Sequence, residues 1–152
     1  MPSIGAGAWF VMLWAYAGFM VVGATAAGAA VMEAYVDRLR QEVAAQSGAI
    51  LIAEDGGRFL GLVACVVAQD DAVQETADSN IHGYITDIYV VPERRGSGLA
   101  QALLRAAEAY LAPTGVSRLR INVLAANVRA RRAYEKHGFE PYEVMYEKRL
   151  GE

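Results

Sequence analysis

The residues with the clearest chemical meaning lie between Tyr84 and Ala100, where an apolar run meets a basic, glycine-rich turn and then a helical pattern. Gly96 and Gly98 remove side chains where another group could approach the backbone closely. The first turn of a helix leaves its N–H groups without intrahelical partners, and the helix dipole attracts anions there. Arg94 and Arg95 add forked donors that suit phosphate oxygens. This order of strand, turn and helix predicts a pyrophosphate-binding loop, and the alternative is an ordinary strand-to-helix turn.

A second informative pattern runs from Asn127 to Phe139 and is typical of a short, complete helix. Asn127 suits the N-cap, and Gly138 suits the left-handed conformation that ends a helix. One face of this helix carries, at helical spacing, Ala130, Ala133 and Tyr134. The helix therefore presents a tyrosine on the same side as its small apolar residues.

These two patterns resemble the motifs of the GCN5-related N-acetyltransferase (GNAT) family. The run Arg95-Gly96-Ser97-Gly98-Leu99-Ala100 resembles the family's Arg/Gln-x-x-Gly-x-Gly/Ala loop. The second motif is matched by Asn127, Ala130, Tyr134 and Gly138-Phe139. The resemblance covers roughly residues 49–149. It implies an α/β fold, the acyl-CoA N-acyltransferase fold, with a mixed central sheet flanked by helices and two strands that splay apart beside the coenzyme.

The same resemblance implies an activity, which is transfer of an acetyl group from acetyl-CoA to a primary amine of a small molecule or peptide. The loop N–H groups would hold the pyrophosphate, and the strand before the loop would offer its backbone to pantetheine and the acetyl carbonyl. Tyr134 would protonate the departing thiolate, and the alternative is an ordinary core tyrosine. The coenzyme-binding residues implied are Ile88, Tyr89, Val90, Arg95, Gly96, Ser97, Gly98, Leu99, Ala100, Gln101 and Asn127.

The group that takes the amine's proton has three candidates. Strand alternation predicts one shared face for Ile85, Asp87, Tyr89 and Val91. A carboxylate on such an apolar strand is costly unless it is partnered or faces a cleft, which makes Asp87 the first candidate catalytic residue. His82 has a suitable intrinsic pKa but sits at the end of a loop. An ordered chain of water molecules is the third candidate.

Composition narrows the range of partners. A length of 152 residues favours one domain, and a net charge of -3 argues against nucleic acid as a partner. Cys65 is the one cysteine and lies in an apolar run, so we expect a core residue and no internal disulfide. His82 and His137 lack metal-ligand spacing, so no metal site is predicted. The acidic stretch 69–82 is either a solvated loop or a lip that attracts a cationic amine.

Periodicity and turn residues predict the elements that position these side chains. A helix ends near Ser47-Gly48, and a hairpin turn covers residues 55–58. The expected strands are 49–54, 59–68, 83–91, 118–124 and 142–148, and the expected later helices are 99–111 and 127–137. The first of these helices is expected to face the core with Leu99, Ala102, Leu103, Ala106 and Tyr110.

Residues 1–32 carry no charged side chain and form an apolar segment ahead of the expected N-acetyltransferase domain at 33–152. The segment is long enough to span a bilayer, and Arg38 and Arg40 would then leave the following domain on the cytoplasmic side. We favour buried helices, packed within a cytoplasmic enzyme or in a homodimer interface, over a membrane anchor. No opening strand is readable. A non-catalytic acyl-CoA-binding or regulatory module and a membrane-tethered interaction protein are the alternative functions.

Overall fold

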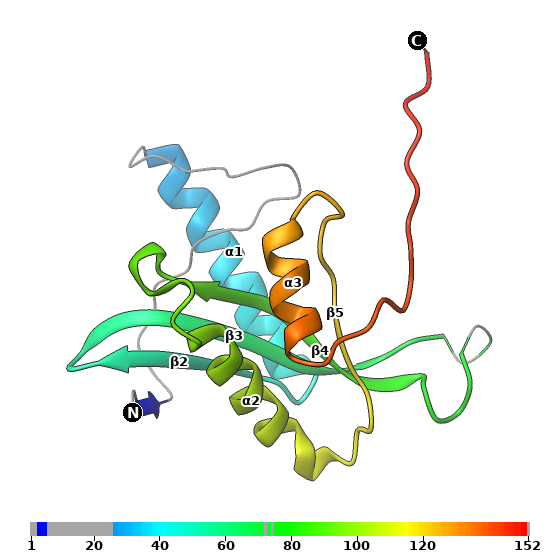
Figure 1. The fold of residues 1–152 in the computed structure, drawn as a ribbon, viewed down its shortest axis with the longest axis horizontal. Helices are drawn as coiled ribbons and strands as arrows, with labels where there is room; N and C mark the ends of the chain where they lie inside the picture. The colour runs from blue at the N-terminus through cyan, green and yellow to red at the C-terminus, as the bar shows by residue number, and fades with distance from the viewer. Residues whose placement is uncertain (1–2, 6–25, 72, 74, 152) are drawn as a thin grey trace. The chain divides into compact units, whose positions relative to one another are not determined.

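The computed structural model describes residues 3–5, 26–71, 73 and 75–151. The chain divides into two compact units, Met1–Asn122 and Val123–Glu152. The first unit contains a β-sheet with a helix on each face, and the second contains one helix and an extended C-terminal segment (Figure 1).

The sheet of the first unit has five strands in the spatial order β1-β2-β3-β4-β5. These strands are β1 (Ser3–Gly5), β2 (Ala49–Asp55), β3 (Arg58–Gln69), β4 (Ile81–Val90) and β5 (Leu119–Ile121). The pairs from β1 to β4 are antiparallel, and β5 runs parallel to β4. The predicted α/β class with a mixed central sheet is confirmed.

Strand β1 corrects the expectation that the chain has no opening strand. Its three residues pair with Ile52, Ala53 and Glu54 of β2. A strand of three residues is too short for side-chain alternation to be recognised in the sequence. Its backbone groups can pair with a neighbouring strand whatever the side chains are.

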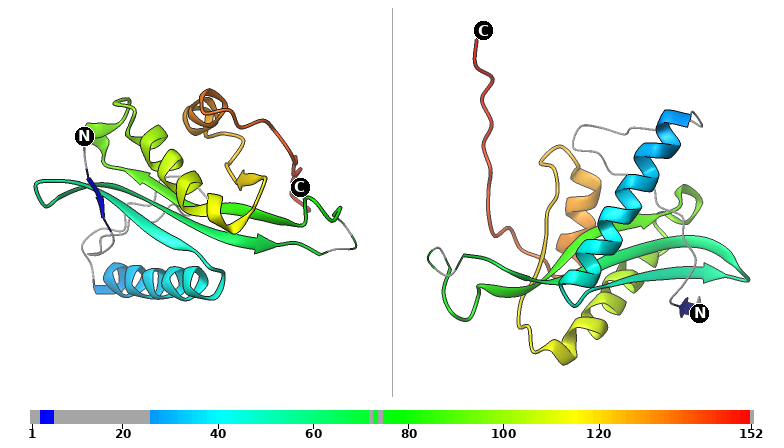
Figure 2. Two further views of the ribbon diagram at one scale, coloured as in Figure 1. Left: turned by 90° about the horizontal axis from the view of Figure 1, so that it is seen from below. Right: turned by 180° about the vertical axis from the view of Figure 1, so that it is seen from behind.

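Two helices cover opposite faces of the sheet (Figure 2). Helix α1 (Ala26–Ala45) packs Leu39 and Val43 against Ala64 and Val66 of β3. Helix α2 (Leu99–Leu111) covers the other face, where a Cβ added to Gly61 would lie 3.3 Å from Leu103 Cδ1. The buried apolar side chains of both faces form the core.

The buried stripe of α2 is rotated from the one that the sequence predicted. The buried residues are Leu99, Leu103, Leu104, Ala107 and Leu111. Ala102 and Ala106 are only half-buried and Tyr110 is exposed, so the prediction is wrong for these three. The larger leucine side chains remove more apolar surface from water than the alanines do, and they therefore determine which side of the helix faces the sheet.

The connections agree more closely with the sequence. Gly56 and Gly57 have φ angles of 56° and 81°, the positive pair that a two-residue hairpin needs, so the predicted turn is confirmed. The remaining helical elements are η1 (Pro92–Arg94), η2 (Ala112–Thr114) and α3 (Val128–Lys136).

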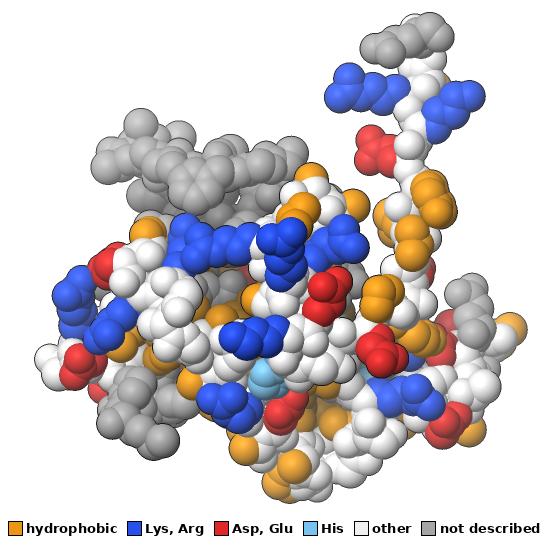
Figure 3. Space-filling model, in the orientation of Figure 1, with side chains coloured by type: hydrophobic (Ala, Val, Ile, Leu, Met, Phe, Trp, Pro, Cys, Tyr) orange, Lys and Arg blue, Asp and Glu red, His pale blue; other side chains and the backbone are white. Residues whose placement is uncertain are grey.

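The C-terminal segment differs from its prediction. Residues 142–148, which the sequence predicts to be a strand, form no strand. Tyr142, Val144 and Tyr146 are 61%, 67% and 92% exposed. Figure 3 shows hydrophobic side chains on the surface of this extended segment. An alternating pattern makes a strand only where a neighbouring strand supplies backbone partners, and sequence alone does not show whether that neighbour is present.

Most of the apolar segment at the N-terminus lies outside the described residues. Helix α1 begins at Ala26 and continues through the expected boundary between residues 32 and 33. Within the described ranges, no helix combines the length and apolar character needed to cross a membrane. Packing of residues 1–32 within the protein or a homodimer stays a prediction.

Candidate active site

The glycine-rich loop after β4 leads directly into α2. Gly96 and Gly98 have φ angles of 78° and 85°, in the left-handed region that favours glycine. A Cβ added to either would meet nothing within 4 Å, so the backbone here borders open space. The first hydrogen bond of α2 runs from the Ala102 N–H to the Gly98 carbonyl, at 3.1 Å. The preceding N–H groups, from Leu99 to Gln101, have no intrahelical acceptor and suit an anion.

The arginines of the loop hold it in place. The Arg95 Nε donates to the Val90 carbonyl at 3.1 Å, and its guanidinium carbon lies 6.0 Å from the centroid of the Tyr89 ring. Arg94 pairs with Asp55 of the β2–β3 hairpin, with Nη2 and Oδ2 3.4 Å apart. The Ser97 hydroxyl donates to the Arg94 carbonyl at 2.5 Å and closes the turn. In this structure the basic side chains therefore stabilise the loop beneath the open backbone.

The strand edge that leads to the loop is open for half its length. Strand β5 pairs with Gly83, Tyr84 and Ile85 of β4 and ends at Ile121. No other described strand pairs with β4 on that side beyond Ile85. Ile88, Tyr89 and Val90 lie in this unpaired part of β4. The expected separation of the two strands is thus present, although the Val90 carbonyl is already engaged by Arg95.

A β-bulge at Thr86 decides which way Asp87 points. In the β3–β4 ladder, Ala64 pairs with Asp87 but Cys65 pairs with Ile85, so Thr86 is the extra residue. Asp87 therefore shares the α1 face of the sheet with Ala64, and Ile85 points to the α2 face with Cys65. The prediction that Ile85 and Asp87 share a face is wrong, because strict alternation does not survive a bulge.

Asp87 is bonded to a side chain that the sequence did not connect with it. The Tyr35 hydroxyl, on α1, donates a hydrogen bond to Asp87 Oδ1. Burial raises the pKa of the Asp87 carboxyl, and the hydrogen bonds of Tyr35 and Thr86 partly oppose that rise. A carboxylate with a raised pKa is a stronger base, which suits it to accept a proton near neutral pH. Tyr35 packs against apolar clusters beneath its helix, and nothing in the sequence marked its hydroxyl.

The second motif belongs to the unit formed by residues 123–152. The Asn127 side-chain oxygen accepts from the Ala130 N–H at 3.1 Å and caps α3 as predicted, and Gly138 has a φ of 100°. The ring centroid of Tyr134 lies 5.9 Å from that of Phe139, in an edge-to-face arrangement. Burial raises the pKa of Tyr134 to about 12, so its hydroxyl keeps its proton at neutral pH.

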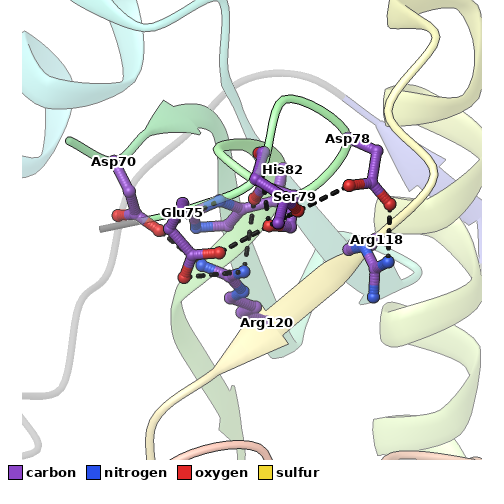
Figure 4. Close-up of polar contacts among 8 residues, drawn as sticks. Asp70, Glu75, Asp78, Ser79, His82, Arg118 and Arg120 are labelled. Carbon is purple, nitrogen blue, oxygen red and sulfur yellow. Dashed lines mark hydrogen bonds and ion pairs between the residues drawn. The ribbon is translucent and has the colours of Figure 1, made fainter. Parts of the chain in front are cut away.

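The alternative base, His82, lies within a charged cluster at the start of β4 (Figure 4). His82 is 3% exposed, and burial followed by the charge of Arg120 lowers its pKa. Arg120 forms ion pairs with Asp70 and with Glu75, the second at 3.4 Å. Arg118 pairs with Asp78 at 3.0 Å. The carboxylates of the acidic loop thus pair with arginines at and just before β5. These ion pairs argue against the hypothesis that the loop attracts a cationic amine substrate.

Comparison with known proteins identifies the family. The acetyltransferase (GNAT) family model matches residues 14–139. A mycothiol acetyltransferase from Thermobispora bispora is 36% identical over 114 residues, which are 72% of this chain but 36% of that protein. An aminoglycoside N(6')-acetyltransferase type 1 from Stenotrophomonas maltophilia is 33% identical over 113 residues, 73% of this chain and 72% of that protein. The chain therefore spans about a third of the length of the first relative and most of the second.

A solved structure shows the same fold. The structure of AAC(6')-Iy in complex with the bisubstrate analogue CoA-S-monomethyl-acetylneamine has a TM-score of 0.64, covering 78% of this chain and 80% of that chain. At 22% identity this likeness speaks for the fold alone. The family match covers most of the sequence and includes both motifs. The chain belongs to the GNAT family of N-acetyltransferases, which are acyltransferases that use acetyl-CoA.

Proposed function

We propose that this protein is an N-acetyltransferase that moves an acetyl group from acetyl-CoA to a primary amine of a small molecule or peptide in the cytoplasm. The observation that carries the proposal is the open space at Gly96 and Gly98, which lie between the unpaired end of β4 and the first turn of α2, whose N–H groups lack intrahelical acceptors. The named relatives, which include aminoglycoside and mycothiol acetyltransferases, favour a small-molecule amine.

The chemistry assigns each part of the site a task. In the proposed reaction, the amine nitrogen bonds to the acetyl carbon, and the bond from that carbon to the coenzyme sulfur breaks. The loop N–H groups and the capping residue Asn127 hold the coenzyme, with pantetheine along Ile88–Val90. Asp87 takes the proton that the amine loses, because its raised pKa makes it a stronger base than an ordinary carboxylate. Tyr134 gives a proton to the departing thiolate, so the products are an amide and a free thiol.

A thiol-release assay tests the overall reaction. The protein is incubated with acetyl-CoA and a panel of amines that includes aminoglycosides, amino sugars, polyamines and peptides. We expect free thiol to appear with at least one amine, together with a product about 42 Da heavier than that amine, because an acetyl group has replaced one hydrogen on its nitrogen. Tight binding of acetyl-CoA with no turnover across the panel would favour a non-catalytic acyl-CoA-binding module.

Substitution of Tyr134 tests the general acid. Tyr134→Phe keeps the ring and removes the hydroxyl, so the contact with Phe139 and the fold should persist. General acid catalysis contributes about 10²–10⁴-fold, so kcat should fall by about that factor while acetyl-CoA affinity stays close to wild type. Steady-state turnover with a confirmed amine and direct acetyl-CoA titration measure the two quantities. A variant with most of its kcat intact would show that another group protonates the thiolate.

A further inference from the structure

The contact between Tyr35 and Asp87 joins two elements that are far apart in the sequence. The two residues are 52 positions apart, on α1 and β4. The bulge at Thr86 makes the contact, because it turns Asp87 away from the α2 face and toward α1. The Thr86 hydroxyl donates to the Ala64 carbonyl at 3.3 Å and so ties the bulge to β3. The backbone thus places this carboxylate on the α1 face of the sheet instead of the α2 face.

Tyr35 is the stronger of the two neutral hydrogen-bond partners of Asp87, and Thr86 is the other. From α1, Arg38 and Glu42 act on the carboxylate with opposite signs, and both are weaker influences than the Tyr35 bond. The Arg38 guanidinium carbon lies 5.4 Å from the centroid of the Tyr35 ring. From β4 itself, Tyr84 and Tyr89 share this face of the sheet.

Tyr35 packs against two apolar clusters of buried residues, of which β2 and β3 contribute Ile52, Leu62, Ala64 and Val66. A carboxylate in such surroundings loses hydration and needs a hydrogen-bond donor to stay charged. Burial also raises the pKa of the Tyr35 hydroxyl, so it remains a donor at every pH at which the enzyme would be assayed.

We propose that Tyr35 is a positioning residue for the acceptor half of the reaction, whose hydroxyl binds Asp87 Oδ1 and holds the carboxylate in the orientation in which it takes the amine's proton. This proposal rests on the proposed function and on the assignment of Asp87 as the base. Tyr35 has two effects. It fixes the rotamer of the carboxylate, and it stabilises the charged form that accepts the proton.

The sign of the expected pH effect follows from the two opposing influences. Burial raises the pKa of Asp87, and the Tyr35 hydrogen bond lowers it. Without the Tyr35 hydroxyl, less opposes the effect of burial, so the pKa of Asp87 rises. The charged form of Asp87 that accepts the proton is then populated only at a higher pH. The free energy of a hydrogen bond to a charged group is large enough to move the acidic limb of the profile of kcat/KM against pH by about one pH unit.

The experiment compares Tyr35→Phe with wild type and uses a confirmed amine acceptor. In the variant we expect the acidic limb of kcat/KM to move upward by about one pH unit, and kcat at the optimum to fall several-fold. The KM for acetyl-CoA should stay within about twofold, because the loop is untouched. An acidic limb that does not move would overturn the proposal.

Two control variants separate the possible failures. Tyr110→Phe also removes a hydroxyl that bonds across the fold, to the Gly48 carbonyl at 2.9 Å, and should leave the pH profile unchanged. An equal shift in that control would reduce Tyr35 to a structural role and overturn the proposal. Asp87→Asn should abolish the acidic limb. If the Asp87→Asn variant retains the acidic limb, then Asp87 is not the base and Tyr35 does not position it. The proposed acetyl transfer would still be supported by turnover.

Discussion

The two loops that flank β4 look alike in charge density but use their charges differently. The loop before the strand, residues 70–80, is acidic, and the loop after it, residues 91–98, is basic. In the first loop the carboxylates of Asp70, Glu75 and Asp78 pair with arginines at and just before β5. In the second the side chains pair with neighbours, but the backbone around the glycines faces open space. The carboxylates of the acidic loop are thus engaged within the fold, whereas the glycine loop leaves backbone open at the start of a helix, where N–H groups lack intrahelical acceptors.

The ion pairs of the two loops also differ in their exposure to solvent. The Arg120 side chain is 16% exposed and contacts two carboxylates, of which Glu75 is 17% exposed. The Arg94 and Asp55 side chains are 45% and 68% exposed, so water screens their attraction. We therefore expect the acidic loop to contribute to stability and the glycine loop to contribute to binding.

The largest expected effect comes from removing the arginine at the centre of the acidic loop. Arg120→Met leaves Asp70, Glu75 and the Ser79 carbonyl without their cationic partner. Because these groups are only partly buried, we expect a loss of about 2 kcal/mol in the free energy of unfolding, below the full cost of a broken buried pair. Urea denaturation measures this loss. Acetyl-CoA affinity of the folded variant should be unchanged, and a large drop in affinity would contradict the division between the loops.

The matched control for that experiment is Arg118→Met. Its partner Asp78 lies at the surface, with a side chain that is 71% exposed. Solvent screens this pair, so the midpoint of denaturation should barely move. Equal destabilisation by both variants would mean that the acidic loop depends on total charge and not on the enclosed position of Arg120.

The second effect tests the glycine loop. Gly98→Val places a branched side chain at a φ of 85°, in the space where the coenzyme phosphates are expected. We expect acetyl-CoA binding to weaken at least tenfold, about 1.4 kcal/mol. Gly115→Val is the control, because Gly115 has a φ of 79° and equally open surroundings but follows η2. Calorimetry that finds wild-type affinity in folded Gly98→Val would remove the loop from the site.

The smallest effect concerns His82 and pH. Its pKa is lowered in the folded protein, so the unfolded chain takes up a proton first as pH falls through the ordinary value of about 6.5. Stability supplied by the neutral ring is present above that pH and is lost as pH falls toward the folded pKa. Chemical denaturation at pH 7.5 and 5.5 should show this loss in wild type and less of it in His82→Gln. An identical pH dependence in the two proteins would mean that other groups cause the loss.

Local signals in the sequence predicted the parts of the fold that depend on few residues. Gly56 and Gly57 specified a turn, Asn127 specified a helix cap, and the bounds of α2 agree with the predicted range. Each of these depends on backbone conformation or hydrogen bonds within a few positions of the residue concerned. The glycine loop was predictable for the same reason.

Longer-range features were not predictable in the same way. The bulge at Thr86 reversed the face of Asp87 relative to Ile85, and it exists only in the register between β3 and β4. The Tyr35 contact follows from that register. The strand expected at 142–148 is absent because its existence depends on a neighbouring strand. One candidate catalytic residue was therefore named from the sequence, but its partner was not.

The early end of β5 has a consequence for the protein in the cell. From Thr86 onward, one side of β4 lies beside no described strand, and an exposed strand edge is a template for association with other chains. A bound coenzyme running along Ile88–Val90 would cover that edge, and binding to the folded state alone raises its apparent stability. Acetyl-CoA would then act as a folding ligand as well as a substrate. We expect the yield of unaggregated protein to follow the coenzyme supply, and to fall first when that supply is low.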